Sequence, residues 1–271
     1  MTALEVEDLR IVGTDGRALV RDLSFSLAPG ERLGLIGESG SGKSLTALSI
    51  IGLLPEGLEP RGSIGLGGTQ IVGASESTMN RLRGRAAGIV FQEPLTALDP
   101  LMRLGAQLAE PLRRRARAEG ARLDRRRLAA AVTAALEEVS LGDTDRIARA
   151  YPHEVSGGQR QRVAIAIALA GRPELLIADE PTTALDVTIQ SEILDLLDRI
   201  VRDRGMSLLF IGHDLAVVAR VADRVIVLKD GQPVEQGRLT ELLTAARHPY
   251  TRDLVASARK LDEALDRSAT S

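Results

Sequence analysis

Hydrophobic positions in this chain gather into four short runs that predict buried strands. The runs are apolar and are bounded by Gly, Asp or Pro. They are Arg32–Gly37, Glu174–Asp179, Ser207–Gly212 and Arg224–Leu228. Continuous apolar runs of this length are typical of strands that are buried on both faces, as in a parallel sheet.

Helical patterns lie between these runs and cover Lys43–Leu54, Gly158–Ala170 and Thr188–Asp203. Strands that alternate with helices predict an α/β fold with a mostly parallel sheet as its core. Two N-terminal runs, Leu4–Val12 and Leu23–Leu27, are shorter and more polar, so we expect an antiparallel β layer beside that sheet. Asp230-Gly231 predicts a hairpin turn followed by a short strand.

The interval from about 94 to 157 differs, because it has no strand-like run and is rich in Ala, Leu and Arg. Gly105–Arg117 and Asp124–Val139 predict helices, so we expect a helical subdomain inserted into the α/β core. Its basic residues are Arg113, Arg114, Arg115, Arg117, Arg122, Arg125, Arg126 and Arg127. This stretch is either a solvated helix face or a surface that attracts anionic lipid headgroups or a partner.

Composition narrows the classes of function. The 271 residues are 44% hydrophobic and carry a formal net charge of −2, so no overall attraction to nucleic acid is expected. The absence of Cys excludes disulfides, thiolate metal sites and thiol catalysis, and the three His are scattered. The start is polar, and every apolar stretch is far shorter than the roughly 20 residues of a membrane span, which predicts a soluble, cytosolic protein.

A complete phosphate-loop motif, GxxxxGK[ST], follows the first buried run and opens a predicted helix. Its residues are Gly37, Glu38, Ser39, Gly40, Ser41, Gly42, Lys43 and Ser44. Glycines let backbone N–H groups converge on phosphate oxygens, and the N-terminus of the helix favours the same anion. We expect Lys43 to contact the outer phosphates of a nucleotide and the Ser44 hydroxyl to bind Mg²⁺. The alternative is a glycine-rich turn that binds no nucleotide.

Two acidic residues, Asp179 and Glu180, end the second buried run. Asp179 is placed to hold Mg²⁺, usually through water, and Glu180 is the candidate general base that polarises an attacking water. Taken alone, the pair would equally fit a solvated acidic turn. The phosphate loop upstream favours the metal site.

Together with these motifs, four more resemble those of ABC ATPases. Val155-Ser156-Gly157-Gly158-Gln159 resembles the family's signature sequence, usually LSGGQ, with Val in place of the leading Leu. Gln92 matches the Q-loop glutamine, Ala184-Leu185-Asp186 the D-loop, and His213 the switch histidine. Each is weak alone, since SGGQ by itself is often only a loop before a helix. Their joint order over residues 37 to 213 makes the resemblance specific.

The resemblance implies the P-loop NTPase fold of an ABC nucleotide-binding domain, with ATP and Mg²⁺ as cofactors. It implies that Ser156, Gly157, Gly158 and Gln159 complete the ATP site of a partner subunit, so that two ATP molecules lie between two ATPase subunits. The dimer then closes on ATP and opens on ADP.

Roles for the other motif residues follow from the same resemblance. Glu180 and His213 would organise water and phosphate, Gln92 would report the nucleotide state to the helical insert, and Asp186 would link the two sites. The implied Mg²⁺ ligands are Ser44, Gln92 and Asp179. Family members often stack adenine on an early aromatic residue, whereas this chain has none before Phe25. We therefore expect aliphatic contacts around Ile11–Thr14 to hold the base.

Particular segments resemble ATPases that serve peptide and nickel importers. His248–Leu254 (HPYTRDL) resembles their C-terminal extension, although an ordinary proline-initiated helix is the alternative. Tyr151–Glu154 and Phe91–Pro100 fit the same group, and Gly42–Thr46 with Gly52–Pro55 resembles the first of the two ATPases that such importers carry. The implied domains are an ABC ATPase domain at 1–240, with its insert at 94–157, and an extension at 241–271.

The function implied is the ATP-hydrolysing subunit of an importer for peptides or for nickel or another metal chelate. Its partners would be two transmembrane permeases, a second and non-identical ABC ATPase and, indirectly, an extracytoplasmic substrate-binding protein. The chain would lie on the cytoplasmic face of the cell membrane and bind no nucleic acid. The alternative is a non-transport ABC ATPase that works on nucleic acid or in a soluble enzyme complex.

Overall fold

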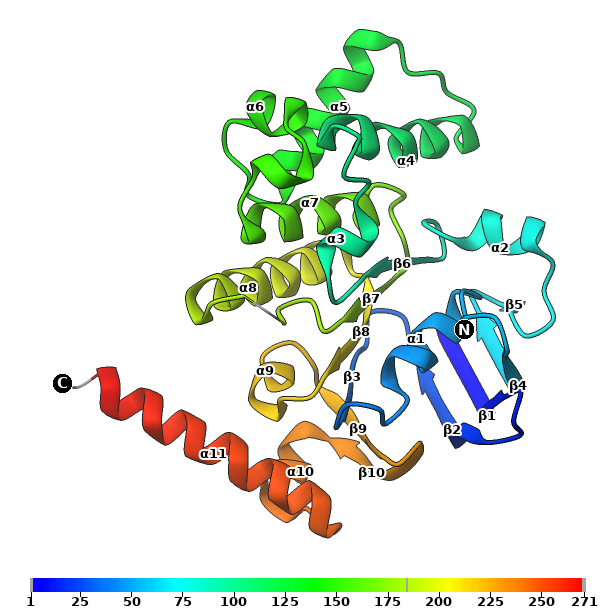
Figure 1. Ribbon diagram of the computed structural model, residues 1–271, viewed down its shortest axis with the longest axis vertical. Coiled ribbons are helices and arrows are strands. Elements are labelled where there is room, and N and C mark those ends of the chain that lie inside the picture. The colour runs from blue at the N-terminus through cyan, green and yellow to red at the C-terminus, as the bar shows by residue number, and fades with distance from the viewer. Residues whose placement is uncertain (1, 184, 270–271) are drawn as a thin grey trace. The chain divides into compact units, whose positions relative to one another are not determined.

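The computed structural model describes residues 2–183 and 185–269, without the side chains of 95–96 and 260–269 (Figure 1). The chain divides into two compact units. The first unit is Met1–Met79 with Ser207–Ser271, and the second unit is Asn80–Met206. None of the described helices is both long and apolar enough to cross a membrane.

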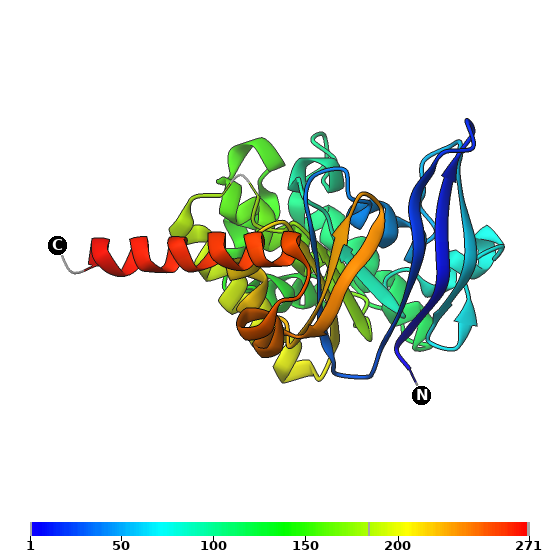
Figure 2. The same ribbon diagram turned by 90° about the horizontal axis from the view of Figure 1, so that it is seen from below.

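The first unit holds two sets of strands. The strands are β1 (Leu4–Gly13), β2 (Ala18–Leu27), β3 (Arg32–Gly37), β4 (Leu58–Leu66), β5 (Thr69–Gln70), β8 (Ser207–Gly212), β9 (Arg224–Lys229) and β10 (Gln232–Arg238). One set has the order β2-β1-β4-β5 and is antiparallel, which confirms the predicted antiparallel layer (Figure 2). Four strands of the other set run in the order β10-β9-β3-β8.

In this second set β3 lies between β8 and β9 and is parallel to both. All three runs were predicted as buried strands, and Leu33, Leu35 and Ile36 of β3 are fully buried. Strand β10 returns antiparallel to β9. Asp230 and Gly231 join them, with φ of 50° and 79°, the left-handed pair that a tight hairpin turn requires.

The helices of the first unit pack on these strands or on one another. They are α1 (Lys43–Ile50), α9 (Leu215–Ala219), α10 (Leu239–Ala245) and α11 (Pro249–Ala269), with α2 (Glu76–Leu82) at the boundary between the units. The prediction for α1 was wrong at its C-terminal end, which lies four residues before Leu54. Gly52 takes φ of 62°, and the N–H groups of Gly52 and Leu53 donate to the carbonyls of Ser49 and Leu48 at 3.2 and 2.8 Å. This Schellman arrangement ends the helix.

The second unit is mainly helical. Its two strands, β6 (Ala87–Val90) and β7 (Leu175–Asp179), are parallel. Its helices are α3 (Pro94–Ala97), α4 (Leu104–Ala118), α5 (Arg125–Glu138), α6 (Thr144–Arg149), the short 3₁₀ helix η1 (Pro152–Glu154), α7 (Gly157–Leu169) and α8 (Val187–Arg204). The described part of 94–157 is free of strands. The domain boundaries at 94–157 and 241–271 stay predictions.

Helix α4 is amphipathic, and its apolar stripe faces the other helices of the second unit. Leu104, Leu108 and Leu112, spaced by four residues, are at most 3% exposed. The next turns of α4 carry Arg113 and Arg117 on the exposed side. The basic stretch is therefore a surface feature, as both of its interpretations require.

Helix α11 begins at Pro249, as a proline-initiated helix does, and its role as an importer-type extension stays a prediction. The turn before it is fixed by Glu235 of β10. The Glu235 carboxylate accepts hydrogen bonds from the N–H groups of Arg247 at 2.8 Å and His248 at 3.0 Å. Burial would raise the pKa of Glu235, but these backbone donors lower it below its ordinary value.

Because the folded-state pKa of Glu235 is depressed, its ionised form should stabilise the fold above pH 4.5, its ordinary value. We expect this stability to be lost as the pH falls through the lower, folded-state pKa. Glu235→Gln should reduce the free energy of unfolding at neutral pH by about 1 kcal/mol, because a charged acceptor becomes neutral. Urea unfolding between pH 3 and 7 checks this, and an equal loss at every pH in that range would contradict it.

Candidate active site

The phosphate loop joins the end of β3 to the start of α1. Gly40 and Gly42 have φ of 80° and 93°, which favour glycine. At Gly37 the absence of a side chain is required for a different reason. A Cβ there would lie 2.3 Å from the carbonyl oxygen of Leu228 in β9. The loop therefore turns back closely over the sheet, with its backbone free of side-chain bulk.

Two polar side chains are buried within this loop. The Lys43 side chain is almost fully buried, and its Nζ donates to the carbonyl oxygens of Gly37 at 2.8 Å and Glu38 at 2.9 Å. The Ser41 Oγ is also buried and has no hydrogen-bond partner among the described residues. A buried hydroxyl and a buried ammonium beside a glycine-rich helix N-terminus fit a phosphate group.

His213 follows the strand next to the phosphate loop. Ile36 of β3 pairs with Gly212 of β8 in parallel register, so Gly37 and His213 follow the same edge of the sheet. The imidazole is exposed. The next residue, Asp214, caps α9 by accepting the Ala216 N–H at 2.8 Å, which fixes the backbone after His213.

Tyr250, at the start of α11, is a neighbour of the phosphate loop that the sequence analysis did not find. Its ring is buried, and the Lys229 Nζ lies 5.1 Å from the ring centroid. Burial raises the pKa of the Tyr250 phenol, and the negative charge of Glu38 raises it further. The HPYTRDL segment was noted only for its resemblance to an importer-type extension, and it could not show this contact, which depends on where β9 and α11 meet.

The second unit brings Gln92 and Glu180 together. Val90 of β6 pairs with Ala178 of β7 in parallel register. Gln92 and Glu180 each come two residues later, so both follow the carboxyl ends of these neighbouring strands. The Gln92 Nε2 donates to a carboxylate oxygen of Glu180 at 3.2 Å. Glu180 has φ of 45°, which is unusual for a residue with a side chain and is typical of a functional position.

Thr183 is a further member of this cluster that sequence reasoning missed. Its Oγ1 donates to the same Glu180 oxygen at 3.0 Å. The only sequence signal is a hydroxyl residue three positions after the acid, in the turn that follows β7. Asp179, at the end of β7, is 6% exposed. Glu180 thus has a fixed orientation beside a nearly buried carboxylate.

The signature segment begins α7 with a reciprocal cap. The Ser156 Oγ accepts the Gln159 N–H at 3.2 Å, and the Gln159 Oε1 accepts the Ser156 N–H at 3.1 Å. Ser156 itself is exposed, so the helix start is open to an anion. The Gln159 side chain has a capping role here, and its contact with nucleotide stays a prediction.

Asp186 has a structural role next to the signature segment. It caps α8 by accepting the Ile189 N–H at 2.9 Å. Ile189 packs on Gly158, where a Cβ would lie 2.9 Å from the Ile189 Cγ2. The start of α7 is therefore close to the start of α8. Ala184 of the predicted D-loop lies outside the described residues.

Each unit thus gathers its own part of the predicted site. The first unit holds the phosphate loop, with Ser39 and Ser44, and His213. The second unit holds Gln92, Asp179, Glu180, the signature segment and Asp186. That both groups of residues act on one nucleotide stays a prediction. The set of Mg²⁺ ligands also stays a prediction. In the stretch expected to hold adenine, Ile11 is fully buried in the sheet, so Val12 to Thr14 are the residues with exposed surface.

A methyl group at Gly37 should disrupt the phosphate loop, because the obstructing atom belongs to the backbone of β9. We expect Gly37→Ala to cost about 1–3 kcal/mol of unfolding free energy and to weaken ATP binding. Urea unfolding and ATP titration measure both effects. The matched control is Gly142→Ala, where a Cβ would meet open space. If both variants behaved alike, the close approach would not matter.

Known proteins share this sequence and fold. The family model described as ABC transporter matches residues 20–183. The oligopeptide transport ATP-binding protein OppD of Mycobacterium bovis is 46% identical over 96% of this chain, but the chain spans only 42% of that relative's length. A putative peptide import ATP-binding protein of Brucella ovis is 45% identical over 97% of this chain and 79% of its own length.

Solved structures agree with these relatives. A dimeric ATP-binding cassette in a post-hydrolysis state, bound to ADP and Pi, superposes with a TM-score of 0.76 at 28% identity, over 87% of this chain and 98% of that one. The cbiO1 protein of Clostridium perfringens, part of the ABC transporter complex cbiONQ, superposes with a TM-score of 0.76 at 27% identity. The match covers 98% of this chain and 99% of that one. The fold is that of an ABC ATPase cassette. The chain belongs to the ABC transporter family.

Proposed function

We propose that this chain is the ATP-binding and ATP-hydrolysing subunit of an ABC importer for peptides. The observation that carries the hydrolytic part is the Glu180 carboxylate, which Gln92 and Thr183 orient at the end of β7. The names of the relatives at 45–46% identity support peptides as the cargo. No described feature specifically favours nickel.

ATP is the substrate in this proposal. Lys43, the buried Ser41 hydroxyl and the backbone of the glycine-rich loop bind its phosphates, and the start of α1 favours their negative charge. Glu180 takes a proton from the attacking water, and Gln92 and Thr183 keep the carboxylate in position. His213 donates a hydrogen bond to the γ-phosphate that the water attacks, and ADP leaves as the bond between the γ-phosphorus and its bridging oxygen breaks. Together these groups bind the nucleotide, orient the attacking water and move one proton.

Magnesium is the proposed cofactor, with Ser44, Gln92 and Asp179 as its ligands. No group of three or more His, Asp or Glu within the described residues could hold a metal, so phosphate oxygens and water must complete the coordination. When bound, Mg²⁺ neutralises charge that develops on the phosphates. Asp179 supplies a nearly buried carboxylate for this role.

A second ATPase subunit completes the site in this proposal. The exposed Ser156, with the open N-terminus of α7, would contact the γ-phosphate held by the partner. The dimeric post-hydrolysis cassette among the similar structures supports such a pairing. The chain would then lie peripherally on the cytoplasmic face of the membrane, with two permeases and, indirectly, a substrate-binding protein.

Uptake measurements test the proposal. Deletion of this chain's gene in its host should abolish uptake of a labelled oligopeptide. The wild-type gene should restore uptake, whereas Glu180→Gln should not. Uptake of the free amino acids serves as the control and should not change. Undiminished peptide uptake in the deletion strain would overturn the import function, and loss of nickel uptake alone would assign the cargo to a metal chelate.

A further inference from the structure

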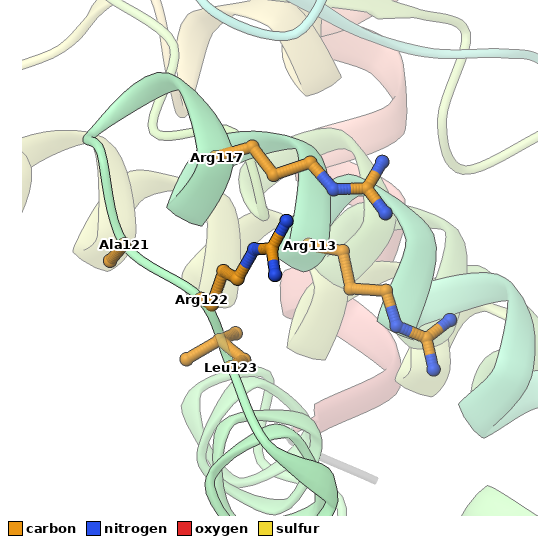
Figure 3. A pocket seen from close by; sticks show the side chains of 5 residues that line it. All are labelled: Arg113, Arg117, Ala121, Arg122 and Leu123. Atoms are coloured by element: carbon orange, nitrogen blue, oxygen red, sulfur yellow. The ribbon is translucent and has the colours of Figure 1, made fainter.

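Three arginines gather around a hollow on the second unit. Arg113 and Arg117 lie one turn apart on α4, and Arg122 lies on the segment that leads to α5. Ala121 and Leu123 complete the lining. Figure 3 shows the Arg122 guanidinium turned back toward α4, on the side where Arg113 and Arg117 project. Three guanidinium groups therefore share one small concave surface.

The positive charge in this hollow is poorly compensated. The side chains of Arg117 and Arg122 have no ion-pair or hydrogen-bond partner among the described residues. Arg113 lies 4.0 Å from the Glu110 carboxylate, and both side chains are about half exposed. An exposed pair at that distance contributes little. The three side chains carry the same charge, so an anion bound in the hollow would be attracted by all of them.

The surroundings extend this charge. Residues 110–127 contain eight arginines and three acidic residues, a net charge of +5, whereas the whole chain carries −2. The rest of the molecule is thus acidic. This disfavours the binding of a long polyanion, because such a ligand would also contact the acidic surface around the basic stretch. A single small anionic group is what a hollow of this kind fits.

We propose that Arg113, Arg117 and Arg122 bind the phosphate of an anionic phospholipid headgroup. A guanidinium pairs with phosphate oxygens through two parallel N–H donors. A single phosphate has enough oxygens to accept such hydrogen bonds from more than one arginine. Leu123, half-buried in the same hollow, offers an apolar contact beside the phosphate. A lipid is the source because the proposed function, on which this inference rests, places the chain at a membrane surface.

Vesicle binding tests the site directly. The purified chain should sediment with phosphatidylcholine vesicles that contain phosphatidylglycerol and not with phosphatidylcholine alone. The triple variant Arg113→Gln, Arg117→Gln, Arg122→Gln should bind the anionic vesicles roughly 100-fold more weakly, because each of the three basic residues near such a surface adds about 1 kcal/mol, about a factor of five. The control Arg17→Gln, Arg61→Gln, Arg238→Gln removes the same charge from other exposed positions and should bind nearly as the wild type does.

Three results would overturn the inference. In the first, the wild-type protein binds vesicles equally well with and without phosphatidylglycerol. In the second, both triple variants lose vesicle binding to the same extent. In the third, micromolar pyrophosphate displaces the protein from vesicles, which would assign the hollow to a soluble phosphate. ATP hydrolysis is measured on the same preparations. Absent hydrolysis in every protein would contradict the proposed function while leaving the vesicle comparison readable, so the two failures are distinguishable.

Discussion

Replacing Glu180 by Gln should lower ATP turnover by about 10²- to 10⁴-fold, the usual contribution of a general base. Gln nearly matches the shape of Glu, and its amide oxygen can still accept from Gln92 and Thr183. The amide cannot take a proton from water. Binding of ATP should therefore persist, because the phosphate loop is unchanged. Phosphate release and equilibrium ATP binding measure the two effects separately.

A matched control lies at the other end of the same strand. Glu174 immediately precedes β7 and is exposed, so Glu174→Gln should leave turnover near that of the wild type. If Glu180→Gln also kept wild-type turnover, Glu180 would not be the base. If Glu180→Gln lost ATP binding as well, its role would be to hold the nucleotide.

Lys43→Ala should weaken ATP binding by roughly 10- to 100-fold, since a charged hydrogen bond contributes about 1.5–3 kcal/mol. The Lys43 Nζ also joins the carbonyls of Gly37 and Glu38, so its removal leaves the loop less ordered. Isothermal titration with ATP measures the affinity, and thermal unfolding shows whether the variant folds.

Lys43→Arg separates the shape of the cation from its charge. A planar guanidinium cannot replace a compact ammonium in a site that is almost fully buried, so this variant should also impair ATP binding. Retained affinity in both variants would argue that the loop does not bind phosphate.

Much of the fold could be predicted because burial leaves a clear pattern. Strands β3 and β8 were predicted with their correct bounds, since each is a continuous apolar run. By contrast, β4 carries polar residues and glycine, and β6 has only four residues, so neither stood out. The end of α1 was missed because apolar residues continue past Gly52, where the backbone turns left-handed.

The site residues could be predicted where a motif carries them, but their neighbours could not. The phosphate-loop motif identifies Lys43 because its residue types and spacing serve one chemistry. Thr183 belongs to none of these motifs, and its bond to Glu180 forms within the turn after β7. Tyr250 lies in the HPYTRDL segment, but its contact with Lys229 arises only because α11 meets β9. The capping roles of Gln159 and Asp186 also required the structure, since the sequence resemblance placed Gln159 at the ATP site of a partner and Asp186 as a link between the two sites.

The most direct test concerns the assembled ATP site. In a structure of the complete transporter that carries Glu180→Gln and is trapped with ATP and Mg²⁺, Lys43 should contact the phosphates of its own nucleotide. Ser156 of the same chain should lie within hydrogen-bonding distance of the γ-phosphate held by the partner ATPase. If Ser156 were remote from every γ-phosphate while ATP occupied both sites, the proposed mechanism would be wrong.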